Sequence, residues 1–166
     1  FENIIVGEGI DGLLGYLVRI FIERGDNVVT TDGAYPTFNY HVEGFGGQLH
    51  KVPFKNDTED LDSLLSKVIE TKAKILYVSN PNNPMGTLNQ VKHIENLIKN
   101  LPKNTLLCLD EAYIDFVPST LIPQISINKL NVIRMRTFSK AYGMAGARVG
   151  YGIGNKELIL NFEKVR

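Results

Sequence analysis

A single lysine, Lys140, lies among small residues, hydroxyls and glycines in the segment 137–150. A lysine amine held in a dry, crowded site is driven toward its neutral form, and a neutral amine can attack a carbonyl carbon to form a Schiff base. Thr137 and Ser139 precede this lysine, and Arg148 follows it. Hydroxyls and a guanidinium are suited to binding phosphate. One segment could therefore hold a ligand that carries both an aldehyde and a phosphate, such as pyridoxal 5'-phosphate (PLP).

Two further stretches accompany this segment. Residues 79–87 read Ser-Asn-Pro-Asn-Asn-Pro-Met-Gly-Thr, and residues 109–113 read Leu-Asp-Glu-Ala-Tyr. A lysine alone in such a loop is typical of an exposed surface residue, so the interpretation depends on the three motifs together. In this order they resemble the motifs of fold-type I PLP-dependent aminotransferases of class I/II, most closely the histidinol-phosphate aminotransferase family.

A glycine-rich turn at residues 7–12 lies between a β-branched run and a helical pattern. Backbone N–H groups at a helix N-terminus bind phosphate. The resemblance implies that the amides of Gly9, Ile10 and Asp11 hold the PLP phosphate together with Thr137, Ser139 and Arg148. The same turn spells the dinucleotide fingerprint G-x-G-x-x-G, which leaves a dinucleotide-binding oxidoreductase domain as an alternative.

The resemblance also implies how the rest of the cofactor is held. Tyr35 stacks on the ring, while Asn83 and Tyr113 lie at its phenolic oxygen. Asp110 ends an apolar run, so its carboxylate is expected to be buried and to need a cationic partner, which a protonated pyridine nitrogen supplies. Lys140 forms the Schiff base and then moves the proton between the substrate Cα and the cofactor C4′. The implied catalytic residues are Lys140, Asp110 and Tyr113.

Four neighbouring polar residues are assigned structural places. We expect Glu111 and Asp115 to be helix-start or surface carboxylates. Asn80 and Asn82 are expected to cap turns within the proline-rich run, because asparagine side chains readily bond nearby backbone groups.

Apolar β-rich runs alternate with amphipathic helical patterns along the chain. Strands are predicted at 4–6, 27–31, 49–54, 74–79, 105–109, 132–137 and 148–153, and helices at 13–22, from Pro36, at 60–69 and from Asn89 or Gln90 to Lys99. Strands that are apolar on both faces predict an α/β three-layer sandwich with a mostly parallel central sheet. The motifs follow strand ends, so they should converge at the carboxyl edge of that sheet.

Composition excludes several classes of function. The chain has 166 residues, 43% of them hydrophobic, and a formal net charge of zero, as in ordinary soluble globular domains. It has no basic stripe for nucleic acid and no apolar run long enough to span a membrane. Its three histidines lack the spacing of metal ligands, so no metal site is expected. The single Cys108 fits a reducing compartment, which predicts a cytoplasmic protein.

The resemblance implies the wider organisation. Residues 1–166 would be the central part of the PLP-binding large domain, without the small domain that such enzymes build from both termini. The enzyme would be a homodimer in amino-acid biosynthesis. It would transfer an amino group between an amino acid, of the histidinol-phosphate or aromatic type, and a 2-oxo acid such as 2-oxoglutarate.

Other functions remain open from the sequence. A lyase or a decarboxylase of the same fold type would use the same cofactor, and a PLP-sensing regulator would add a DNA-binding part. We also expect residues 1–166 alone to bind PLP poorly.

Overall fold

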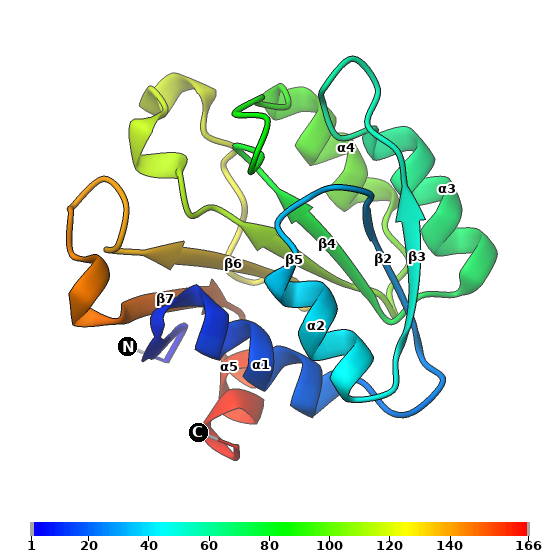
Figure 1. Ribbon diagram of the computed structural model, residues 1–166, viewed down its shortest axis with the longest axis horizontal. Coiled ribbons are helices and arrows are strands. Elements are labelled where there is room, and N and C mark those ends of the chain that lie inside the picture. The colour runs from blue at the N-terminus through cyan, green and yellow to red at the C-terminus, as the bar shows by residue number, and fades with distance from the viewer. Residues whose placement is uncertain (1, 166) are drawn as a thin grey trace.

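The computed structural model describes residues 2–165, which form one seven-stranded sheet with helices on both faces (Figure 1). The strands are β1 (Ile4–Glu8), β2 (Asn27–Thr31), β3 (Gln48–Val52), β4 (Ile75–Ser79), β5 (Leu106–Asp110), β6 (Val132–Thr137) and β7 (Val149–Gly154). The α-helices are α1 (Gly9–Phe21), α2 (Thr37–Gly44), α3 (Leu61–Thr71), α4 (Val91–Asn100) and α5 (Lys156–Glu163). Three short 3₁₀ turns are η1 (Ile114–Phe116), η2 (Ser119–Leu121) and η3 (Ala145–Ala147).

The strand order is β1-β7-β6-β5-β4-β2-β3. β7 runs antiparallel to both of its neighbours, β1 and β6, and the pairs among β6, β5, β4, β2 and β3 are parallel. All strands except β7 therefore point the same way, which confirms the predicted mostly parallel sheet. Their carboxyl ends lie at one edge, and β7 begins at that edge.

Two apolar cores fill the three layers. Side chains alternate across each strand, so Tyr77 and Cys108 face one core while Val78 and Leu109 face the other. The first core packs beneath α1, α2 and α5, and the second beneath α3 and α4. Figure 1 shows these two groups of helices on opposite faces of the sheet. Because both faces are covered, the central strands β4 and β5 are buried at every position and largely apolar, which is the pattern that predicted the fold.

Local chemistry explains where the element ends differ from the predictions. The strand predicted at 49–54 ends at Val52, because Pro53 has no N–H to donate to a neighbouring strand. Asp60 lies outside α3 and caps it, accepting a hydrogen bond from the Ser63 amide at 3.2 Å. Arg148 precedes β7 because its φ of 52° is left-handed.

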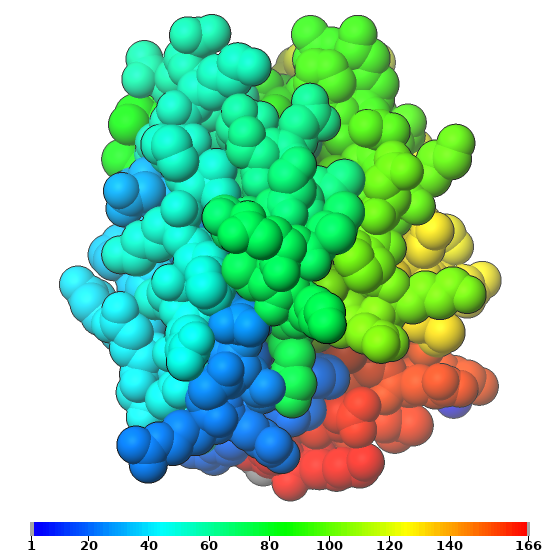
Figure 2. Space-filling model, turned by 90° about the vertical axis from the view of Figure 1, so that its right-hand side faces the viewer, coloured from blue at the N-terminus to red at the C-terminus, as the bar shows by residue number. Residues whose placement is uncertain are grey.

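At the amino edge of the sheet, segments that are distant in sequence lie side by side. Figure 2 views this side, where the end of α1, the chain around residue 70 and α5 come together. Phe21, Ile69 and Leu158 line a recess there. Among residues 2–165, no helix is long and apolar enough to cross a membrane, and no cluster of side chains could hold a metal ion.

Candidate active site at the carboxyl edge of the sheet

One open cavity of about 150 Å³ lies at the carboxyl edge of the sheet. The residues that line it follow the ends of strands, because β1, β2, β4, β5 and β6 all end at this edge and β7 starts there. Ten of the eleven residues predicted above line it, together with Ser79 and Ala112. They are Ile10, Asp11, Tyr35, Asn83, Asp110, Tyr113, Thr137, Ser139, Lys140 and Arg148. The eleventh, Gly9, lies against the Arg148 guanidinium.

The N-terminus of α1 forms one end of the cavity. The helix begins at Gly9, and the preceding Glu8 side chain makes no capping hydrogen bond to it. Gly9 has a φ of 77°, and a Cβ at this position would lie 2.7 Å from Nη2 of Arg148. The left-handed backbone therefore favours glycine at this position, and any other residue would also displace the Arg148 guanidinium from the turn. Free N–H groups and a guanidinium on the same side of the cavity make this end an anion site.

β7 packs directly on this turn. A Cβ at Gly150 would lie 2.6 Å from the carbonyl carbon of Gly9 and 2.8 Å from the amide nitrogen of Ile10. Backbone thus meets backbone without a side chain between them. The antiparallel strand β7 thus packs against the first turn of α1.

Two hydroxyls lie beside the anion site. Oγ1 of Thr137 is 2.9 Å from Oγ of Ser139 and 3.2 Å from the Val149 carbonyl, and it accepts a hydrogen bond from the Ser139 amide at 3.1 Å. These contacts fix the turn that carries Lys140. Arg148 is exposed and donates from Nη1 to the Ala145 carbonyl at 3.0 Å. Its other guanidinium nitrogen is the one that lies over Gly9.

Asp110 lines the same cavity and is buried, as predicted. Its carboxylate accepts hydrogen bonds from the Tyr77 hydroxyl at 2.6 Å and from the Ala112 amide at 2.9 Å. Burial raises the pKa of Asp110 above its usual range, and these two donors oppose the increase. Within residues 2–165, Asp110 forms no ion pair. A cationic ligand group would therefore be stabilised beside it.

Lys140 is expected from the sequence to lie in a dry, crowded site. Within residues 2–165 its side chain is exposed to solvent instead, so that expectation is wrong. Its Nζ lies 5.2 Å from the centre of the Tyr113 ring, within the range of a cation–π contact. The amine is thus directed into the cavity but not shielded from water.

Tyr35 and Asn83 complete the cavity wall. Tyr35 is 40% exposed, so its ring is free to cover a ligand. Asn83 is half-buried and follows Asn82, which caps the loop by accepting from the Met85 amide at 3.2 Å, as expected of a turn asparagine. Tyr113 packs against Phe116 with ring centres 6.4 Å apart. The structure brings Asn83 and Tyr113 to the same cavity, although it records no hydrogen bond between them.

The sheet topology argues against a dinucleotide at the glycine-rich turn. The dinucleotide fingerprint requires a βαβ unit with parallel strands. Here β1 is an edge strand antiparallel to β7, and β1 and β2 are at distant places in the sheet. The turn can therefore bind an anion through its backbone amides, as the fingerprint does, but it does not lie in the fold that binds dinucleotides.

Comparison with known proteins agrees with the motifs. Residues 2–166 match the family model of aminotransferase class I and II. The chain belongs to this family. A histidinol-phosphate aminotransferase of Moorella thermoacetica is 37% identical over 169 residues, which cover 99% of this chain and 44% of that relative. The chain therefore spans about half the length of the curated relatives it matches.

Solved aminotransferase structures share the fold. The structure of histidinol-phosphate aminotransferase from Sinorhizobium meliloti in complex with PLP gives a TM-score of 0.97 at 50% identity, covering 99% of this chain and 46% of that one. A putative histidinol-phosphate aminotransferase from Erwinia carotovora atroseptica gives 0.91 at 28% identity, covering 98% and 49%. L-threonine-O-3-phosphate decarboxylase from Porphyromonas gingivalis gives 0.83 at 23% identity, which shows the fold alone.

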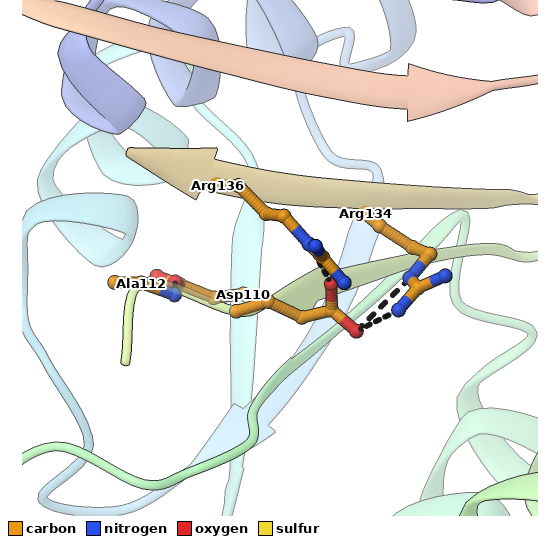
Figure 3. A network of polar contacts seen from close by, with 5 residues as sticks. Asp110, Ala112, Arg134 and Arg136 are labelled. Carbon is orange, nitrogen blue, oxygen red and sulfur yellow. Dashed lines mark hydrogen bonds and ion pairs between the residues drawn. The ribbon is translucent and has the colours of Figure 1, made fainter. Parts of the chain in front are cut away.

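In this class I and II chain, Glu111 is not a surface carboxylate, so its predicted place is wrong. It is 1% exposed, and its oxygens accept from Nε and Nη2 of Arg134 at 2.9 and 2.8 Å and from Nε of Arg136 at 2.7 Å. Figure 3 shows both arginines reaching from β6 toward this carboxylate beside Asp110. The feature of the sequence that could have indicated a buried partner for Glu111 is the pair of arginines at alternate positions of β6, whose other residues are mostly apolar. Asp115, by contrast, is exposed as predicted.

Sequence reasoning missed four further residues at or behind this cavity. Ser79 and Ala112 line the cavity, and their positions at strand ends could have indicated them. Tyr77 holds Asp110 but lies inside an apolar strand, where its hydroxyl gives no local signal. Glu59 is a buried carboxylate behind the 80–89 loop, and no motif points to it.

Proposed function

We propose that this chain is the central part of the large domain of a longer, PLP-dependent aminotransferase. One observation carries the proposal: the Lys140 amine, the buried Asp110 carboxylate and the N-terminus of α1 beside Arg148 line a single cavity. An amine, an anion and an anion-binding turn are complementary to an aldehyde, a protonated ring nitrogen and a phosphate. The match to the class I and II family supports the same cofactor.

PLP, when bound, supplies an electron sink for the bonds at the substrate Cα. The chain's residues supply position and proton transfer. Asp110, fixed by Tyr77 and Ala112, would hold a proton at the ring nitrogen. Nζ of Lys140 would attach the cofactor and, once released, take up and return the proton that moves during amino transfer. The catalytic residues proposed are Lys140, Asp110 and Tyr113.

The remaining groups would fix the ring against Lys140, which is positioning catalysis. Tyr35 would cover the ring, and Asn83 with Tyr113 would contact its phenolic oxygen. The phosphate would be held by the amides of Gly9, Ile10 and Asp11 and by the side chains of Thr137, Ser139 and Arg148.

We propose an amino acid and a 2-oxo acid as substrates, with histidinol phosphate as the first donor to test and 2-oxoglutarate as the acceptor. Identity to the Moorella thermoacetica relative supports this order of testing. We further propose a cytoplasmic homodimer. Exposed apolar side chains of Met85, Phe116, Tyr142 and Met144, on the loops around the cavity, support its covering by another part of the enzyme or by a second subunit. The buried free thiol of Cys108 fits a reducing compartment.

The test is a visible spectrum of the full-length protein with PLP, followed by borohydride reduction and peptide mapping. We expect a yellow protein with the cofactor fixed on Lys140. A colourless protein, or label on another lysine, would contradict the proposal. Product analysis then separates amino transfer from elimination or decarboxylation. Because Lys140 and Arg148 are exposed here, we expect residues 1–166 alone to bind PLP more weakly than the full-length enzyme.

A further inference from the structure

Glu59 is a buried carboxylate outside the cavity lining. It precedes α3 and is 2% exposed. Its Oε1 accepts a hydrogen bond from Nδ2 of Asn82 at 2.9 Å, and the Ser79 amide lies 3.2 Å from Oε2. Ser79 is the last residue of β4, and Asn82 directly precedes Asn83. The Glu59 carboxylate therefore links the end of β4 to Asn82, the residue before the cavity-lining Asn83.

The 80–89 loop closes on the same point. The side-chain oxygen of Asn80 accepts from the Asn89 amide at 2.8 Å, and Nδ2 of Asn89 donates to the Glu59 carbonyl at 3.4 Å. Across the loop, the Asn82 amide donates to the Thr87 carbonyl at 2.8 Å. Glu59 thus contacts residues near both ends of the loop, and Asn83 lies between them.

Helix capping does not account for this acid. The cap of α3 is the next residue, Asp60, which binds the amide and hydroxyl of Ser63. Glu59 also has no ion-pair partner among residues 2–165. Burial, with repulsion from Asp110, raises its pKa to about 8. An unpaired buried acid is costly, and the hydrogen bonds of this carboxylate go to Ser79 and Asn82.

We propose that Glu59 is a positioning residue that fixes the 80–89 loop so that Asn83 is held ready for the cofactor. The proposal rests on the proposed PLP site. An amide that is already fixed loses little conformational freedom when the ligand binds, so less affinity is lost to ordering the loop. Without the Glu59 carboxylate, the loop must be ordered by the ligand itself.

The test compares variants of the full-length enzyme by two measurements. The first is the dissociation constant for PLP, and the second is hydrogen exchange at the Met85 and Gly86 amides without cofactor. Glu59→Ala removes the acceptor, whereas Glu59→Gln keeps one acceptor oxygen. Asp60→Ala is the matched control, because it removes the α3 cap and leaves the loop contacts in place. If Glu59→Ala fails to fold, Glu59→Leu keeps the buried volume without the acceptor.

We expect Glu59→Ala or Glu59→Leu to weaken PLP binding at least about tenfold and to speed loop exchange by a similar factor. Glu59→Gln should restore both to within about threefold of wild type. Asp60→Ala should lower stability and change neither. Unchanged exchange in the Ala and Leu variants, or equal loop exchange in Asp60→Ala, would overturn the proposal. Absence of PLP binding by the wild type would refute the proposed function instead, and the exchange data would still test the loop.

Discussion

The hydroxyl of Tyr77 donates a 2.6 Å hydrogen bond to Oδ2 of Asp110 across the interior of the sheet. Tyr77 is itself fully buried and stacks on Phe38 with ring centres 4.6 Å apart. Burial and the nearby Asp110 charge raise the Tyr77 pKa well above its ordinary value, so the phenol stays protonated and remains a donor. The Asp110 carboxylate is therefore held by a neutral group that belongs to the core.

Replacing Tyr77 with phenylalanine should impair the Asp110 carboxylate without emptying the core. In the wild type, the hydrogen bond from Tyr77 lowers the pKa of Asp110. Removing the hydroxyl should therefore raise that pKa and move the acid limb of the kcat/KM profile to higher pH. We expect kcat/KM near neutral pH to fall about tenfold or more. Tyr40→Phe, at a position 66% exposed, is the control. An acid limb that stays in place would count against this role for Tyr77.

Gly150→Ala should damage the anion-binding turn. The new methyl group would meet the backbone of Gly9 and Ile10, which cannot move as a flexible side chain can. We expect a loss of about 2 kcal/mol or more in the free energy of unfolding, measured with urea, and weaker PLP binding. Gly146→Ala, where a Cβ has no neighbour within 4 Å, should change both quantities little. Equal effects of the two substitutions would exclude the proposed contact.

Glu111→Gln should be strongly destabilising. It leaves Arg134 and Arg136 facing a neutral group in a buried network, and breaking such a network costs about 3 kcal/mol. The control is Glu70→Gln, which breaks the surface pair with Lys67 and should cost less than about 1 kcal/mol. Urea denaturation of both variants measures the difference. A loss at Glu111 no larger than at Glu70 would contradict the prediction.

Stability should depend on pH through Glu59. Its pKa rises from 4.5 to about 8 on folding, so between these values the folded state binds the proton and the unfolded state does not. Stability therefore decreases as pH rises, by about 1.4 kcal/mol per unit between about pH 5 and pH 8. Glu59→Gln removes this dependence, while the titration of Asp110 is present in both proteins. If the difference in unfolding free energy between the wild type and Glu59→Gln is the same at every pH, Glu59 does not titrate in this way.

The sequence predicted the mostly parallel sheet and which residues lie together at its carboxyl edge, but not the direction of every strand. Residues that follow parallel strands must meet at one edge, so Asp110 and Lys140 could be placed together from strand ends alone. The direction of β7 could not be predicted, because an apolar run carries no record of whether its neighbours run parallel. Glu59 and Glu111 were missed or misplaced because their partners lie twenty or more residues away. The exposure of Lys140 likewise depends on surrounding structure rather than on local sequence.

The antiparallel β7 has a consequence for how the site can vary. β6 ends at Thr137 and β7 starts at Val149, and both are fixed in register at Thr137–Gly150. Lys140 and Arg148 therefore belong to a single loop with anchored ends. In the proposed PLP site, the length of that loop would set the distance between the lysine that attaches the cofactor and the arginine that binds its phosphate. Side chains at 141–147 are exposed, so a substitution there leaves the loop length unchanged, whereas an insertion or deletion would shift Lys140 relative to Arg148 and so disturb the proposed cofactor site.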